Sequence, residues 1–119
     1  MIELKMIELI NSMEALREIN SQVLPMRAAF QLARISREVQ KEYDTFETAR
    51  KKLLETYGTK EENGNYKISK ENVEDFNNEI NDLLQINIQL NIEPVVLEDL
   101  EDINISPQNI LYLEKFIKE

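Results

Sequence analysis

The sequence predicts a mostly helical α+β protein, with one long scaffold helix, three shorter helices and a small two- or three-stranded sheet. Over most of the chain apolar residues recur at intervals of three and four, which is typical of amphipathic helices. In 85–92 they instead alternate with polar residues, which is typical of a half-buried strand. A length of 119 residues with 42% hydrophobic residues indicates a single domain, 1–119, with its own core.

The scaffold helix is predicted over 26–57, where one apolar stripe continues without a break. Pro25 suits the start of a helix, and Gly58 lies where a C-terminal cap belongs. Small alanines within the apolar run 26–33 allow close approach of the preceding helix. We expect the helix to be continuous and to bury five members of its stripe, namely Leu32, Ile35, Val39, Phe46 and Leu53.

Helical spacing and capping residues predict the three shorter helices. The first covers 7–22 and ends before the Leu24-Pro25 interruption. Another follows Ser69 and runs to residue 84, and the last begins at Ser106-Pro107 and includes Ile117.

The stretch QINIQLNIEP (85–94) predicts a strand, stopped by its proline. We expect it to pair antiparallel with Tyr66–Ile68, which follows an Asn63-Gly64 turn, or with the N-terminal segment 2–6. Its amides, Asn87 and Gln89 especially, should face solvent or a partner. The apolar row should face the scaffold helix and consists of Ile86, Ile88, Leu90 and Ile92.

The residue inventory argues against an enzyme. The chain has no histidine and no cysteine, and so lacks the commonest general base and the commonest thiol nucleophile. It has no nucleophile elbow, P-loop or dinucleotide-binding fingerprint. We therefore expect no catalytic residues, no cofactor, and no hydrolase or transferase activity that depends on the carboxylates of 98–102.

The net charge of −9 is unevenly distributed. Residues 25–57 carry seven basic and five acidic side chains, whereas residues 61–119 carry four basic and fourteen acidic ones. An acidic half disfavours binding to duplex DNA, because such binding depends on neutralising phosphates. The acids within MIELKMIELI argue against a signal peptide, and no apolar run approaches the ~20 residues that span a bilayer. We expect a cytosolic protein without a membrane segment.

Two charged groups are candidate sites. The densest carboxylate cluster is Glu98, Asp99, Glu101 and Asp102. It could dock a basic protein surface, hold a hard divalent cation or form a solvated loop, but it lacks the glycine and alternating ligands of a calcium loop. We therefore predict partner binding and no metal there.

The second group is a basic stripe formed by Arg27, Arg34, Arg37 and Lys41. Positions 27, 34 and 41 are successive heptad steps and share one helix face. These side chains could clamp the phosphates of a nucleotide or of a partner. They could instead pair with Glu38, Glu42 and the acidic second half of the chain, because ion pairs at such spacings are common on protein surfaces.

A series of segments in fixed order carries a resemblance to a known family. The segments are LPMRAAFQLAR (24–34), ETARKKLLETYGTKEENGNYKIS (47–69), ENVEDFNNEINDLL (71–84), INIQLNIEPVVLEDL (86–100) and ISPQNILYLEKFI (105–117). From about residue 7 onward the chain resembles a family of small tailed-phage and prophage proteins with no assigned biochemical role. The resemblance implies a phage origin, in the cytoplasm of an infected bacterial host or in the virion, and supplies no site to transfer.

These observations favour a non-enzymatic phage protein that binds a protein partner, as a virion or assembly accessory or as an inhibitor of a host protein. The alternative is an anti-defence protein that binds and sequesters a small nucleotide signal, and a homo-oligomer fits either function. The surroundings of the basic stripe discriminate between the two. If the stripe borders a cavity or a subunit boundary, the nucleotide-binding function is favoured. If the stripe faces the acidic loop of its own chain, binding of a protein partner is favoured.

Overall fold

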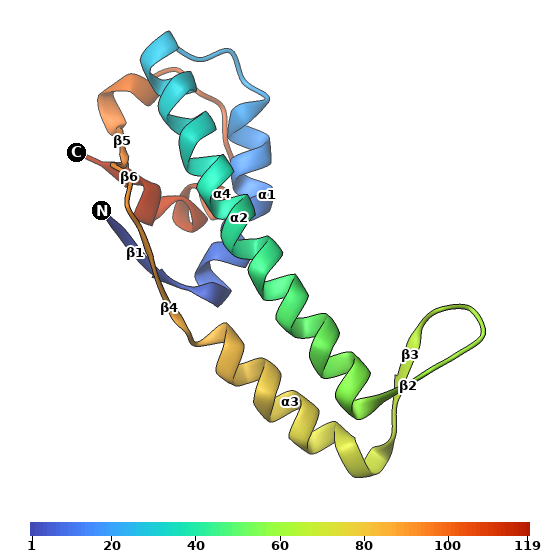
Figure 1. Cartoon of the computed structure of the whole chain (residues 1–119). Coiled ribbons are helices and arrows are strands. Elements are labelled where there is room, and N and C mark those ends of the chain that lie inside the picture. Colours follow the sequence, from blue (N-terminus) through green and yellow to red (C-terminus); the bar gives the residue numbers. More distant parts are fainter.

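Helix α2 (Met26–Tyr57) runs through most of the length of the molecule in the computed structural model, which describes residues 1–119 (Figure 1). Its continuity confirms the predicted scaffold helix, and the molecule measures 52 × 28 × 23 Å. Four of the five stripe residues predicted to be buried are buried, but Leu53 is only half-buried. Leu53 differs because it lies in the part of α2 that extends beyond the main core.

The N-terminal half of α2 belongs to a head that contains almost the whole core. Helix α1 (Met6–Asn20) packs along this half, close to the predicted 7–22. Strand β1 (Ile2–Lys5) and the C-terminal elements complete the head (Figure 1). The buried apolar residues form one cluster of 18, to which helix α3 (Lys70–Leu84) contributes none.

The second half of α2, the hairpin and α3 form an arm (residues 47–84) that projects from the head (Figure 1). Strands β2 (Gly58–Lys60) and β3 (Tyr66–Ile68) pair antiparallel at its tip, and Gly64 in the predicted turn has φ 85°. Gly58 has an extended backbone, yet a Cβ there would lie 2.6 Å from the Leu54 carbonyl oxygen. Any other residue would place its Cβ against this oxygen, so the close contact explains why glycine stands at this helix end.

The alternating segment forms strand β4 (Asn87–Leu90), which pairs antiparallel with β1. The segment 2–6, given as the alternative neighbour, is thus its partner, and the expected pairing with Tyr66–Ile68 is wrong. The 15 residues of α3 carry the chain about 22 Å back from the arm tip to the head, so β4 cannot reach β3.

Within β4 the apolar row is buried and the amide row exposed, as predicted, while the contact of the apolar row with the scaffold helix stays a prediction. Ile88 and Leu90 are buried opposite Leu4 and Ile2, and the amides Asn87 and Gln89 are exposed. Ile92 beyond the strand is buried as well. Ile86 is the exception at 49% exposed, because it lies in the turn between α3 and the first paired residue.

The C-terminal helix begins as predicted and ends early. In α4 (Pro107–Tyr112) the Ser106 hydroxyl accepts a hydrogen bond from the Asn109 N–H at 3.3 Å. A 3₁₀ turn, η2 (Glu114–Phe116), then leads into β6 (Ile117–Lys118), so the helix predicted through Ile117 is shorter than expected.

The early end of α4 follows from packing and pairing together. Leu113 and Phe116 are both buried, and their spacing of three suits a 3₁₀ turn. Strand β6 pairs parallel with β5 (Val95–Val96), which satisfies backbone groups that a continued helix would have bonded internally. The sheet content is therefore three separate two-stranded ladders.

Candidate interaction surface

The basic stripe lies on the outer face of the head half of α2. Arg27, Arg34, Arg37 and Lys41 are all exposed, whereas the opposite face of the same turns is buried in the core. Helical geometry produces this arrangement, because residues seven apart return to nearly the same direction. The structure therefore brings the four basic residues onto one side of one helix, as their spacing predicts.

Little of this charge is neutralised within the chain. Lys41 pairs with Glu38 at 3.3 Å, but none of the three arginines forms an ion pair. The guanidinium carbon of Arg34 lies 5.9 Å from the ring centroid of Phe30, at cation–π distance. The internal pairing considered for the stripe thus occurs at one position only.

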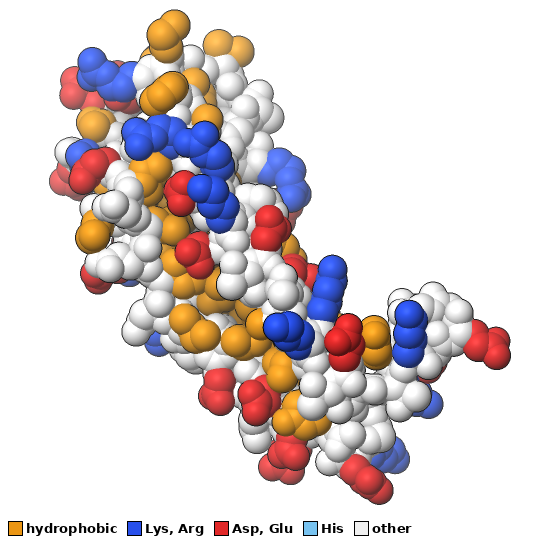
Figure 2. Space-filling model, in the orientation of Figure 1, with side chains coloured by type: hydrophobic (Ala, Val, Ile, Leu, Met, Phe, Trp, Pro, Cys, Tyr) orange, Lys and Arg blue, Asp and Glu red, His pale blue; other side chains and the backbone are white.

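Exposed apolar side chains lie beside the stripe. Val23, Met26 and Phe30 are 100%, 87% and 66% exposed, while Ala28 and Leu32 face the core. We call the following residues of α2 together the basic–apolar face: Met26, Arg27, Phe30, Arg34, Arg37 and Lys41. Figure 2 shows Lys and Arg side chains next to hydrophobic ones over this half of α2.

The apolar run that predicts packing against α1 also contains the signal for this face. The run 26–33 is apolar around much of its circumference, which we attributed to packing against the preceding helix. A helix at the surface of a head can bury only one side. The side chains of Met26 and Phe30 are therefore exposed to solvent and do not take part in the contact with α1.

The acidic segment lies in and after the short 3₁₀ helix η1 (Leu97–Leu100). Three of its four carboxylates are exposed, Asp99 is half-buried, and none forms an ion pair. No group of three or more acidic side chains is arranged to hold a metal ion. The role of Glu98, Asp99, Glu101 and Asp102 in partner binding stays a prediction.

The basic stripe and the acidic segment meet at one shallow cavity between α2 and β5. Arg27 and Gln31 line it from α2, and Glu93, Asp99 and Lys118 line it from the C-terminal part of the chain. Two cationic and two anionic side chains thus share the same opening. Such mixed charge gives little net attraction for a phosphate, so the cavity does not mark an anion site.

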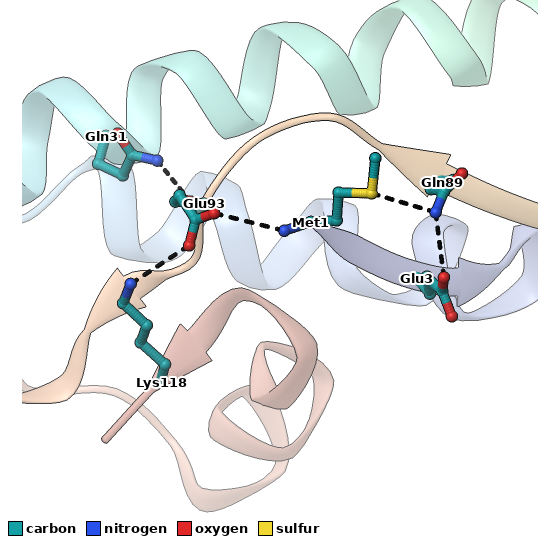
Figure 3. Close-up of polar contacts among 6 residues, drawn as sticks. All are labelled: Met1, Glu3, Gln31, Gln89, Glu93 and Lys118. Atoms are coloured by element: carbon teal, nitrogen blue, oxygen red, sulfur yellow. Dashed lines mark hydrogen bonds and ion pairs between the residues drawn. The ribbon is translucent and has the colours of Figure 1, made fainter.

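A polar cluster around Glu93 joins three elements and was not foreseen from the sequence (Figure 3). Its carboxylate lies 3.5 Å from the Met1 amino nitrogen and 3.3 Å from Lys118 Nζ. Its backbone carbonyl accepts a hydrogen bond from Gln31 Nε2. The hydrogen bond from Lys118, followed by the charge of the amino group, lowers the pKa of Glu93. The cluster fixes the ends of β1 and β6 beside α2.

A second polar cluster occupies the base of the arm. The Glu47 carboxylate accepts hydrogen bonds from Arg50 Nε and Nη2, each at 2.9 Å, and from the Tyr43 hydroxyl at 3.2 Å. The hydrogen bond from Arg50 lowers the pKa of Glu47. Burial, and then the charge of Glu47, raise the pKa of Tyr43.

The depressed pKa makes the Glu47 contribution to stability dependent on pH. It is fully present above the ordinary value of 4.5 and is lost as pH falls through the lower pKa of the folded state. We expect Glu47→Gln to cost about 0.5–1 kcal/mol at neutral pH and less than that at pH ~3. Urea unfolding of both proteins at the two pH values measures this, with Glu55→Gln as a control that removes an unpaired carboxylate from the same helix. An equal cost at both pH values would contradict the assignment.

The chain matches no protein family, no curated protein and no solved structure in the comparisons made. The resemblance to small tailed-phage proteins accordingly stays a prediction. None of the helices has the length and apolar character needed to cross a bilayer.

Proposed function

We propose that the protein is a non-enzymatic bacteriophage protein that acts by binding a protein partner through the basic–apolar face. The carrying observation is that two exposed apolar side chains, Met26 and Phe30, lie on the same side of α2 as three arginines without ion-pair partners. Exposed apolar groups of this kind mark interaction sites, and aromatic residues and arginine are enriched at binding hot spots.

The chemistry of the face defines the surface that fits it. A partner must cover Met26 and Phe30 with apolar groups and offer carboxylates to the arginines. Duplex DNA does not meet this requirement, because the acidic second half of the chain repels phosphates. The acidic segment 98–102 offers a second contact, for a basic region of the same partner.

The resemblance to tailed-phage proteins supports a role in infection. Two roles fit a small binding protein there: a virion or assembly accessory, or an inhibitor of a host protein. Its place is then the cytoplasm of the infected bacterial host or the virion itself. The absence of histidine and cysteine supports a non-catalytic role.

Affinity capture from infected cells with matched variants tests the proposal. Phe30→Ala should reduce recovery of the partner at least tenfold, as expected for loss of an interface hot spot. Leu111→Ala is the matched control, because Leu111 is 68% exposed on α4, outside the face. Recovery of the same proteins by the wild type and Phe30→Ala would contradict the assigned surface.

The nucleotide alternative rests on the arginines without ion pairs, which could grip phosphates. Small-molecule sites are usually concave, whereas this face is the convex side of a helix, and its one adjoining cavity carries mixed charge. Mass spectrometry of nucleotides released from denatured purified protein separates the two functions. We expect none. A nucleotide that co-purifies with the wild type but not with Arg34→Ala would favour the alternative.

A further inference from the structure

One edge of the β1–β4 ladder is directed away from the rest of the ladder, and its backbone polarity follows from the register. The Met6 N–H donates to the Ile86 carbonyl at 3.0 Å, which continues the register of the ladder as a hydrogen-bonded pair. In an antiparallel ladder such pairs alternate with pairs that do not bond to each other. The backbone N–H and C=O groups of Asn87 and Gln89 therefore point away from β1.

The outward backbone groups of β4 have no partner within the chain. No strand pairs with β4 on the side away from β1. None of the backbone hydrogen bonds of turns, loops and caps involves Asn87 or Gln89. The strand lies near the left margin of the molecule in Figure 1, and both of these side chains are exposed. This edge can therefore accept another strand.

The segment that contains this edge is uncharged. Residues 83–92 include no acidic or basic side chain, in a chain that is 31% charged and has a net charge of −9. Proteins commonly prevent an edge strand from pairing with its own copy by placing a charge on it, often a lysine. Neutral segments of high strand propensity without proline or glycine are instead typical of strands that pair with identical strands. A second copy of the chain is therefore the partner that this edge favours.

The amide side chains on the edge are complementary to those of a second copy. Gln89 Nε2 donates to Glu3 Oε1 at 3.1 Å and to Met1 Sδ, which leaves its Oε1 without a donor (Figure 3). The Asn87 amide has no hydrogen bond within the chain, so its Nδ2 is available as a donor. Asn87 of one copy can therefore donate to Gln89 of another, and a two-fold axis repeats the contact.

We propose that β4 pairs antiparallel with β4 of a second copy, so that the two ladders join into one four-stranded sheet. With Ile88 at the two-fold axis, Asn87 of each copy faces Gln89 of the other, and the outward backbone groups of both residues are bonded. Ile86, which is 49% exposed, then lies opposite Leu90 of the second copy and is covered by it. The inference goes beyond the proposed function and uses a surface outside the basic–apolar face.

Light scattering during size-exclusion chromatography tests the dimer on the full chain. The wild type should elute with twice the 14.0 kDa chain mass at ~100 µM, where a dimer with a Kd of ~10 µM is mostly formed. Asn87→Lys should dimerise at least tenfold more weakly, because it places two like charges beside the two-fold axis. Asn77→Lys makes the same change at an exposed position of α3, and this matched control should keep the wild-type mass.

Disulfide cross-linking tests the register, because the chain has no cysteine of its own. Residues that face each other in the proposed pairing have Cα atoms about 5.5 Å apart, which a disulfide can bridge. The two copies of the same residue, two positions out of register, lie about 8–9 Å apart, which is too far. An oxidised mixture of Asn87→Cys and Gln89→Cys chains should therefore form covalent dimers at least fivefold faster than either variant alone.

The outcomes separate this dimer from the proposed function. Phe30→Ala should leave the dimer mass unchanged, and Asn87→Lys should still capture the partner. The dimer is overturned by a monomeric wild type at ~100 µM, by a folded Asn87→Lys variant that dimerises like the wild type, or by a mixture that cross-links no faster than its components. A monomeric wild type whose partner is lost in Asn87→Lys would assign the edge to a strand of a different protein.

Discussion

Replacing Phe46 by alanine is expected to lower the free energy of unfolding by about 3–5 kcal/mol. Phe46 is 8% exposed and is the last residue of α2 in the core cluster, at the point where the arm leaves the head. Its ring centroid lies 6.2 Å from that of Tyr43, so removing it leaves a cavity beside a second aromatic ring. The loss includes both the burial of the ring and the cost of that cavity.

Phe30→Ala is the matched control, because it makes the same chemical change on the outer face of the same helix. Phe30 is exposed, so its loss should change the free energy of unfolding by no more than about 0.5 kcal/mol. Urea denaturation of the two variants and the wild type, followed by circular dichroism, measures both values. Similar costs for the two substitutions would mean that α2 does not pack as described.

The parts of the fold that depend on local pattern could be predicted from the sequence. The bounds of α2 follow from an unbroken apolar stripe with Pro25 before it and Gly58 after it. The facing of Ile88 and Leu90 follows from strict alternation, since a strand places successive side chains on opposite sides.

Long-range pairing could not be predicted in the same way. The choice of β1 over β3 as the partner of β4 depends on where α3 delivers the chain, which no local pattern contains. The end of α4 is similar, because β6 forms only through its pairing with β5, a segment about 20 residues away. The Glu93 cluster joins residues from both ends of the chain and leaves no signal in the sequence around it.

Of the candidate site, the positions of the basic residues could be predicted from local spacing, whereas the exposure of its apolar residues could not. Heptad spacing placed Arg27, Arg34 and Lys41 on one face, and the structure bears this out. The same apolar run that correctly predicted a close approach by α1 obscured the exposure of Met26 and Phe30. Periodicity says which residues share a side of a helix, but only the neighbouring elements decide which of two apolar sides is covered.

Ile88→Ala should lower the free energy of unfolding by about 2–5 kcal/mol, and Ile86→Ala by less than about 1 kcal/mol. Both substitutions remove the same atoms, two residues apart in one alternating row. Ile88 is 6% exposed opposite Leu4 of β1, while Ile86 is 49% exposed before the first paired residue. The expected difference therefore comes from burial alone.

Denaturant unfolding of the two variants measures that difference, and Asn87→Ala on the exposed row provides the baseline. A slip of one residue in the β1–β4 register would expose Ile88 and bury Asn87, because side chains alternate between the two faces. Asn87→Ala would then be the costly substitution and Ile88→Ala the mild one. The order of the three costs thus reports which face of β4 meets the core, and Ile88→Ala should be the largest.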